Sequence, residues 1–267
     1  MTFALSGGGI DVVVDLAGGG RLIGLRAFGR DWLAAGGERS PGDYVQAGSG
    51  GWDEIVPTVS ACVLADGTVL ADHGDAWQSE WALVSADATH VEATVTLSSL
   101  PITLTRRIEA TDAGLRLTYT ASAAGDRQVP LFWCAHPLFA ADPRTRIRVD
   151  GDPGLIEEYP GPRRARDWPA AVGEAAVKAF TAEPVSSASV VHANGDALTL
   201  GWDPELLPYL GLYWDGGEFT ETPVVAIEPA TGYGDSAARA EADGRVATLT
   251  PGVPLRWWLT VAVEQTS

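Results

Sequence analysis

The sequence predicts a large all-β domain in which antiparallel sheets are stacked or curled. Short runs rich in β-branched residues alternate apolar and polar positions, which is the period of a half-buried strand. Gly, Pro, Asp and Asn separate these runs, and helical periodicity is weak. The 267 residues show no composition break, repeat or linker, so we expect a single domain covering residues 1–267.

Two hairpins are the clearest local features of the predicted sheets. Strands at 10–16 and 21–28 flank a run of glycines, and strands at 103–109 and 115–120 flank a turn that contains glycine. Further strands are predicted, in chain order, at 81–86, 91–98, 128–134, 146–149, 189–192, 197–202, 209–214, 224–228, 246–249 and 255–263. Short helices are predicted at 170–179 and 235–242.

The net charge of the chain disfavours some classes of binding partner. A net charge of −17 and a pI near 4.5 disfavour nucleic acid and anionic lipid. No apolar stretch approaches the roughly 18 residues that a membrane span needs, and the N-terminal residues lack signal-peptide features. Cys62 and Cys134 lie in apolar runs and are expected to be free core thiols in a reducing compartment. We therefore expect a soluble cytoplasmic protein.

Glu228 is the strongest single candidate for a functional residue. It stands directly after the nearly all-apolar run 222–227. A carboxylate at such a position is costly to bury unless it is paired or used in a reaction. The position suits a general base, and an ordinary exposed glutamate at a strand end is the alternative.

Two histidines occupy polar junctions elsewhere in the chain. His136 follows an apolar run, and Pro137 is expected to end regular strand pairing there. His73 lies in the polar turn 72–75. If the fold joins them with Glu228, the set supplies a base, an acid and an orienting donor for proton transfer on a polar, uncharged substrate. The alternative for His136 is a half-buried histidine that is hydrogen-bonded to the backbone. The alternative for the His73 segment is a simple turn.

Tryptophan is over-represented, with ten residues against six Tyr and six Phe. A Trp ring offers a flat apolar platform to the C–H face of a sugar at low entropic cost. Trp52, Trp77, Trp133 and Trp214 lie beside polar segments and are candidates for such a platform. Asp53 and Glu54 are candidate acceptors for sugar hydroxyls, unless one of them caps a turn.

Other reaction classes lack their motifs. The sequence has no His-x-His, His-Glu-x-x-His or Cys-x-x-Cys spacing for a metal and no Gly-x-Ser-x-Gly nucleophile motif. Its glycine triplets precede predicted strands instead of helices, unlike a phosphate-binding loop. A metal site made of Asp72, His73 and Asp75 with His136 is a possible but poor alternative, so no metal is expected.

The chain from about residue 50 to its end resembles the aldose 1-epimerase (galactose mutarotase-like) superfamily. Six short segments occur in the order and spacing of that family: 51–58, 72–74, 135–139, 210–214, 226–232 and 249–255. The resemblance implies a large antiparallel β-supersandwich with an open sugar-binding cleft. It also implies an isomerase that interconverts the anomers of free aldoses without a cofactor.

The resemblance also implies roles for particular residues. Glu228 would be the base that removes the C1-hydroxyl proton, and His136 the acid that protonates the ring oxygen. His73 would hydrogen-bond the sugar. Two departures concern the sugar contacts: no Arg stands in the segment that holds Asp53, and Asp167 is the nearest candidate for the family's sugar-binding Asp.

Three other functions stay open at this point. A non-catalytic carbohydrate-binding protein of the same fold would accommodate the missing Arg. A hexose-phosphate mutarotase would use the arginines at 163–166 to bind phosphate, although the negative charge of the chain disfavours this. A glycosidase would need Glu228 and a second carboxylate, from Asp53 or Glu54, separated by roughly 5–10 Å.

Overall fold

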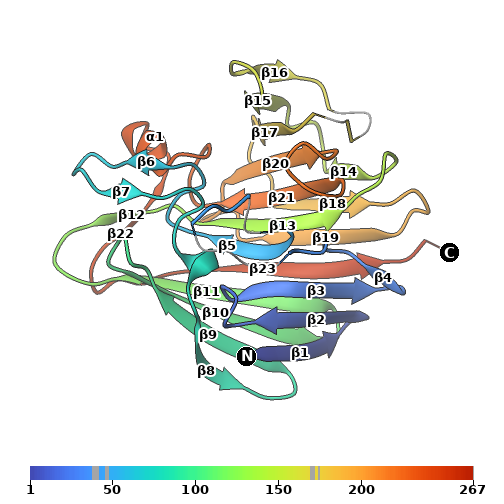
Figure 1. Ribbon diagram of the computed structural model, residues 1–267, viewed down its shortest axis with the longest axis horizontal. Coiled ribbons are helices and arrows are strands. Elements are labelled where there is room, and N and C mark those ends of the chain that lie inside the picture. The colour runs from blue at the N-terminus through green and yellow to red at the C-terminus, as the bar shows by residue number, and fades with distance from the viewer. Residues whose placement is uncertain (38–41, 46–47, 169–171, 174, 267) are drawn as a thin grey trace.

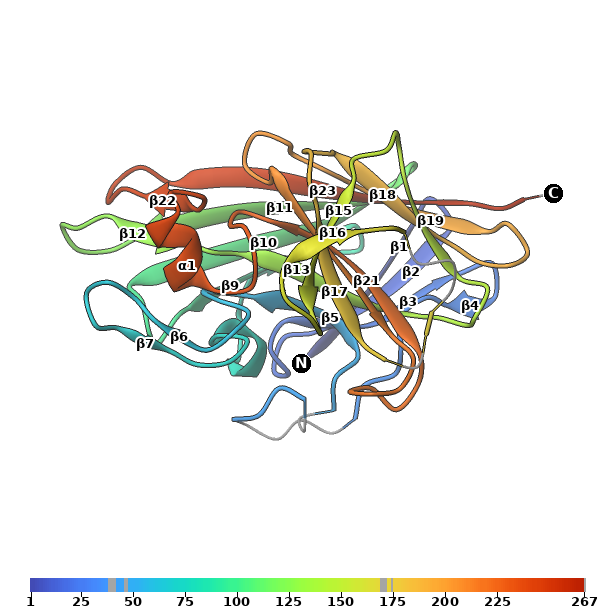
Figure 2. The ribbon, with the colours of Figure 1, turned by 90° about the horizontal axis from the view of Figure 1, so that it is seen from above.

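Two large antiparallel sheets pack face to face in the structure, a computed structural model shown in Figure 1 and from above in Figure 2. The structure describes residues 1–37, 42–45, 48–168, 172–173 and 175–266. Within these residues, helical structure is confined to α1 (Ala237–Ala242) and one 3₁₀ turn (Ala76–Gln78). The all-β prediction is therefore confirmed. No helix of the described residues is long and apolar enough to cross a membrane.

The first large sheet has eleven strands in the described part of the chain. In spatial order they are β1 (Thr2–Gly7), β2 (Ile10–Asp15), β3 (Arg21–Ala27), β5 (Gly51–Ile55), β13 (Cys134–Ala140), β21 (Val224–Ala230), β20 (Tyr209–Asp215), β17 (Val177–Thr181), β15 (Leu155–Tyr159) and β16 (Arg164–Arg166), with β4 (Arg30–Asp31) beside β3. The central strands β13 and β21 come from distant parts of the sequence, so this sheet joins segments that the chain keeps apart.

The second large sheet has eight strands among the same described residues. In spatial order they are β14 (Arg146–Val149), β18 (Ser187–Val191), β19 (Ala197–Trp202), β23 (Leu255–Glu264), β11 (Gly114–Ala123), β10 (Ile102–Thr111), β9 (His90–Thr96) and β8 (Ala82–Ala86). Two small sheets pair β12 (Val129–Leu131) with β22 (Ala247–Leu249), and β6 (Cys62–Val63) with β7 (Val69–Leu70).

The inner faces of the two large sheets form the core. Buried and partly exposed positions alternate along β9 and β10, as expected when one face of a strand is packed and the other is solvated. Buried apolar residues of both sheets form one continuous cluster. Seven of the ten tryptophans, counted among the described residues, are fully buried. The Trp-rich composition therefore serves mainly to pack the core.

Both predicted hairpins are confirmed, because β2 pairs with β3 and β10 pairs with β11. Helix α1 lies inside the predicted segment 235–242. The prediction of a helix at 170–179 is wrong at its described end, where β17 begins at Val177. All five residues of β17 are buried, so the strand has none of the alternation on which sequence assignment depends. Residues 169–171 and 174 lie outside the described part of the chain.

The outer face of the eleven-stranded sheet carries the connections that matter for function. Figure 2 shows the connection before β5, in blue, and the connection between β20 and β21, in orange. Both lie on the side of this sheet that faces away from β10 and β11. A cavity forms between these connections and the central strands of the sheet.

Candidate functional site

His136 and Glu228 lie opposite each other on the adjacent strands β13 and β21. The pairs on either side of them keep one register, which brings these two residues together. The ladder is interrupted between those pairs, where Pro137 and Pro229 have no N–H to donate. Pro137 does not end the strand, as the sequence suggested, because β13 continues through it to Ala140. His136 is therefore in the middle of a buried strand.

The same register extends across the sheet. Asp53 of β5 is opposite His136, and Gly211 of β20 is opposite Glu228. Residues opposite each other in antiparallel strands point to the same face of the sheet. A side chain at Gly211 would meet the Lys178 Cε at 3.3 Å, so the glycine leaves room for Lys178 of β17 to reach Glu228. Four strands, β5, β13, β21 and β17, thus place polar residues on the outer face, and β20 lies between the last two.

These residues line a cavity of about 380 Å³, a volume within the range of small-molecule sites. Its polar lining includes His73, His136, Lys178, Glu228, Asp235 and Tyr44. Apolar side chains from the surrounding connections, among them Val59 and Phe219, form other parts of the wall. The three candidate proton-transfer residues from distant segments therefore converge on one cavity.

Glu228 is 1% exposed, and its two carboxylate oxygens differ in their contacts. Its Oε2 forms an ion pair with the Lys178 ammonium and lies 3.7 Å from the Cys134 Sγ. Its Oε1 is buried without a hydrogen bond among the described residues. Buried carboxylate oxygens in proteins are nearly always paired, so an unpaired one in a cavity wall is an acceptor site for a ligand.

Lys178 is the cation of the site. Its Nζ also lies 3.4 Å from the Asp235 Oδ1. Burial disfavours its charged form, but the attraction of Asp235 and Glu228 outweighs burial and raises the pKa of Lys178. Burial raises the pKa of Asp235, an effect that Lys178 opposes and Glu228 reinforces. The ammonium stays charged at neutral pH and holds two carboxylates in place.

His136 is held as a neutral imidazole by its surroundings. Burial, together with the nearby charges of His73 and Lys178, lowers the pKa of His136 well below its usual range, although Asp53 opposes the shift. The His136 Nδ1 lies 3.1 Å from the Tyr44 hydroxyl, which donates to the Asp53 Oδ2 at 2.9 Å. Within the described part of the chain, the polar side-chain contact of this ring involves Nδ1, and Nε2 is left for a ligand.

His73 reaches the cavity from a tight turn. Its backbone has a φ of 56°, which is the left-handed region, and its N–H donates to the Val59 carbonyl at 2.6 Å. Its Nδ1 lies 2.7 Å from the Asp72 Oδ2, and its ring stacks on Tyr44 with centroids 3.9 Å apart. Gly74 must follow, because a Cβ there would lie 2.2 Å from the Val56 carbonyl oxygen. The turn therefore fixes the ring of His73 at the cavity.

Trp52 and Glu54 do not line the cavity, contrary to the sequence-based expectation. They flank Asp53 on β5 and point to the opposite face of the sheet, because side chains of a strand alternate. Glu54 is fully buried between the sheets, where it accepts hydrogen bonds from Arg106 at 2.9 Å and Trp133 at 2.8 Å. Burial raises the pKa of Glu54 against the opposing charge of Arg106. Its carboxylate belongs to the core.

Trp214 and Asp167 also lie away from the residues that line the cavity. Trp214 is opposite Val225, on the core side of β20 and β21, and its ring is 6.3 Å from that of Trp168. Asp167 is exposed just after β16. Asp53 is on the outer face but contacts Tyr44 instead of contributing to the lining. Of the proposed sugar contacts, His73 alone is part of the cavity lining among the described residues.

Sequence reasoning missed Tyr44, Lys178 and Asp235. Lys178 lies in a strand whose five positions are all buried, and a lysine in such an apolar run is a signal of a paired charge. Asp235 follows a turn rich in glycine, as many loop aspartates do, and gives no comparable signal. Tyr44 comes from a connection with no pattern that the sequence would separate from an ordinary loop.

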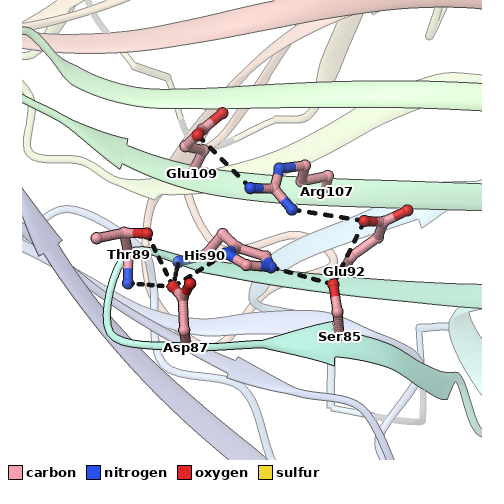
Figure 3. A network of polar contacts seen from close by, with 7 residues as sticks. All are labelled: Ser85, Asp87, Thr89, His90, Glu92, Arg107 and Glu109. Atoms are coloured by element: carbon pink, nitrogen blue, oxygen red, sulfur yellow. Dashed lines mark hydrogen bonds and ion pairs between the residues drawn. The ribbon is translucent and has the colours of Figure 1, made fainter.

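His90 belongs to a structural network on the other large sheet, shown in Figure 3. Its Nδ1 lies 2.9 Å from the Asp87 Oδ1 and its Nε2 lies 3.0 Å from the Ser85 hydroxyl. Hydrogen bonds from Thr89 lower the pKa of Asp87 to about 2. Both ring nitrogens of His90 are thus used within the protein. In the described part of the chain, no three His, Cys, Asp or Glu residues are grouped as a metal site requires.

Neither a protein-family model nor a curated protein sequence matches the chain. Solved structures do match it. The Slr1438 protein of Synechocystis sp. PCC 6803 aligns with a TM-score of 0.81 and 16% identity over 100% of this chain and 96% of that chain. The chain has the galactose mutarotase-like fold.

Two further structures have the same fold. A protein of Escherichia coli K12, provisionally assigned as an aldose 1-epimerase, has a TM-score of 0.79 and 19% identity over 100% of this chain and 99% of that chain. A galactose mutarotase-like protein of Lactobacillus casei ATCC 334 has a TM-score of 0.77 and 18% identity over 99% and 100%. Structural similarity at these sequence identities establishes the fold. The activity has to be argued from the residues of the site.

Proposed function

We propose that this protein is an aldose 1-epimerase, a mutarotase that interconverts the α and β anomers of a free aldose by opening and closing the sugar ring. The observation that carries the proposal is the placement of Glu228 opposite His136 in one cavity, with the Glu228 Oε1 buried and without a hydrogen bond to any described residue. The fold shared with mutarotase-like proteins supports it. The protein acts as an isomerase on a neutral sugar.

The reaction needs two proton transfers on opposite sides of the anomeric carbon. The Glu228 Oε1 takes the proton of the C1 hydroxyl, and the C1 carbonyl forms as the bond from C1 to the ring oxygen breaks. The ring oxygen takes a proton from Nε2 of the doubly protonated His136. Rotation about C1–C2 presents the other face of the aldehyde, and reversal of both transfers closes the other anomer. Lys178 holds Oε2 throughout, and His73 binds a sugar hydroxyl.

The neutral resting state of His136 predicts a pH dependence of kcat/KM. Its pKa lies below the usual value near 6.5. Above that pKa, the doubly protonated fraction of the free enzyme falls about tenfold for each pH unit. We expect kcat/KM to decrease from about pH 6 to about pH 8, measured by anomer-exchange NMR after subtraction of the uncatalysed rate. A constant kcat/KM over this range would show that another group protonates the ring oxygen.

The arginines at 163–166 give little support to a hexose-phosphate mutarotase. Arg163 lies 3.2 Å from a Glu158 oxygen, and Arg164 lies 3.0 Å from the buried Glu157, which also pairs with Arg166. Each of these guanidinium groups already has a carboxylate partner. A phosphate would have to compete with those carboxylates within a chain whose net charge is −17.

A glycosidase that pairs Glu228 with Asp53 or Glu54 is also disfavoured by the positions of those two carboxylates. Glycoside hydrolysis needs two carboxyl groups that flank the scissile bond. Glu54 is in the core, and Asp53 accepts a hydrogen bond from Tyr44. A carbohydrate-binding protein without turnover has the same cavity and differs only in rate.

A panel of aldoses distinguishes these functions. We expect the protein to accelerate anomer exchange of at least one neutral aldose, measured by exchange NMR, and to prefer glucose to glucose 6-phosphate. Sugar binding detected by calorimetry without faster exchange would support the non-catalytic binding protein. Faster exchange of glucose 6-phosphate than of glucose would support the hexose-phosphate mutarotase.

A further inference from the structure

Tyr44 is the residue that joins the two histidines of the site. It is 3% exposed, and its ring is stacked on His73 with an interplanar angle of 7°. The same ring meets the edge of His136, with centroids 5.5 Å apart and an interplanar angle of 90°. Its hydroxyl lies 2.9 Å from the Asp53 Oδ2 and 3.1 Å from the His136 Nδ1. One side chain therefore contacts both imidazoles and a buried acid.

The hydrogen bonds of this group fix the direction of its protons. The Tyr44 hydroxyl has a single proton, and it donates this proton in its hydrogen bond to the Asp53 Oδ2. The Tyr44 oxygen can then only accept from the His136 Nδ1, which must carry a proton. In the neutral ring the other nitrogen, Nε2, is left without a proton. The chain of contacts thus selects one of the two tautomers of His136.

We propose that Tyr44 is a positioning residue that links Asp53 to His136 and thereby fixes which ring nitrogen of His136 exchanges protons with a ligand. The catalytic part of this inference rests on the proposed function. Three strands and one connection cooperate in it: β5 supplies the acid, β13 supplies the imidazole, β21 supplies the base opposite, and the connection before β5 supplies the hydroxyl. A phenylalanine would fill the same space, so the hydroxyl is what carries the role.

The groups around His136 differ in whether they favour or disfavour its doubly protonated form. His73 faces it at 5.5 Å between ring centroids, and Lys178 reaches the same cavity from β17. Both disfavour a second proton on the ring. Glu228 is opposite on β21, but its Oε2 is taken by Lys178. Asp53, reached through Tyr44, is thus the acid that favours the imidazolium without using the ligand-facing nitrogen.

Nitrogen chemical shifts of ¹⁵N-labelled histidine test the link directly. In the wild-type protein at about pH 8, we expect His136 to show a protonated Nδ1 and a bare Nε2, with its signals assigned from their loss in His136→Asn. In Tyr44→Phe, the Nδ1–H acceptor is gone, so we expect the Nε2–H tautomer to dominate. We also expect kcat for anomer exchange to fall about tenfold with KM within about twofold, an effect at the lower end of the range known for residues that orient metal-ligating histidines.

Two further variants make the outcome decisive. Tyr209→Phe removes a hydroxyl that has no hydrogen bond to any described residue, and it should change neither the tautomer nor kcat. In Asp53→Asn, the side-chain amide can donate to the Tyr44 oxygen. Tyr44 can then donate its hydroxyl proton to the His136 Nδ1, and the fraction of His136 in the Nε2–H tautomer should rise. This second variant serves if Tyr44→Phe fails to fold.

Two results would overturn the inference. One is a wild-type His136 that carries its proton on Nε2, and the other is a Tyr44→Phe protein that keeps the wild-type tautomer and kcat. Failure of the proposed function has a different signature. In that case no aldose exchanges faster than background, while the tautomer still changes in Tyr44→Phe.

Discussion

Replacement of Glu228 by Gln is expected to lower kcat for anomer exchange by about 10²–10⁴-fold, the usual contribution of a general acid or base. The amide has nearly the shape of the carboxylate, but it cannot take the proton of the C1 hydroxyl. KM should change less, because sugar hydroxyls can still bond to the amide. Exchange NMR under single-substrate conditions measures both constants.

The control for this variant is Glu264→Gln, the same substitution at an exposed position on β23. The Glu228→Gln protein should fold, because Lys178 keeps Asp235 as a partner at 3.4 Å, and its thermal unfolding can be compared with that of the control. A folded Glu228→Gln protein with a rate within about threefold of the control would refute the assignment of Glu228 as the base.

The alternating apolar and polar runs of the sequence predicted the strands that have one face exposed to solvent. β2, β3, β10 and β11 are strands with a solvated side, and their polar positions mark the period of two. β5 and β17 were not predicted, because all of their residues are buried. A strand covered on both faces, by the core on one side and the site on the other, shows no alternation. β21 is also buried throughout, but its run of β-branched residues was still predicted as a strand at 224–228.

The same effect explains which of the predicted site residues lie at the cavity. Once β5 is known to be a strand opposite β13, the register with His136 selects Asp53 for the outer face and assigns Trp52 and Glu54 to the core. The sequence alone gave no register, so all three neighbours were equal candidates. Lys178 and Tyr44 reach the site through pairing and loop placement over long sequence separations, which no local pattern records.

Replacement of Arg106 by Met is expected to lower the free energy of unfolding by about 3–5 kcal/mol, the usual effect of removing one partner of a buried ion pair. Arg106 of β10 and Glu54 of β5 form this pair between the two large sheets, with side chains that are 1% and 0% exposed. The guanidinium also donates to the Gly20 carbonyl and lies over the Trp81 ring. Without it, Glu54 is a buried carboxylate with no cation. Urea denaturation measures the loss.

The decrease in the free energy of unfolding caused by Arg106→Met should depend on pH in a defined direction. Burial already raises the pKa of Glu54, and removal of Arg106 raises it further. An acid whose pKa is higher in the folded state keeps its proton on folding, whereas the unfolded chain releases it above about pH 4.3. The variant should therefore be less destabilised at pH 5 than at pH 8. Equal losses at both values would contradict a buried Glu54 charge.

A double variant, Arg106→Met with Glu54→Gln, separates the ion pair from simple packing. It removes both charges, so it should recover much of the stability lost in Arg106→Met and abolish the pH dependence. Anomer exchange per folded molecule should remain close to wild type in this double variant, because Glu54 faces the core and Glu228 faces the cavity. If exchange were lost while the protein stayed folded, Glu54 would act on the substrate after all. The adjacent residues of β5 thus make opposite predictions: a change at Glu54 alters stability, and a change at Asp53 alters the chemistry of His136.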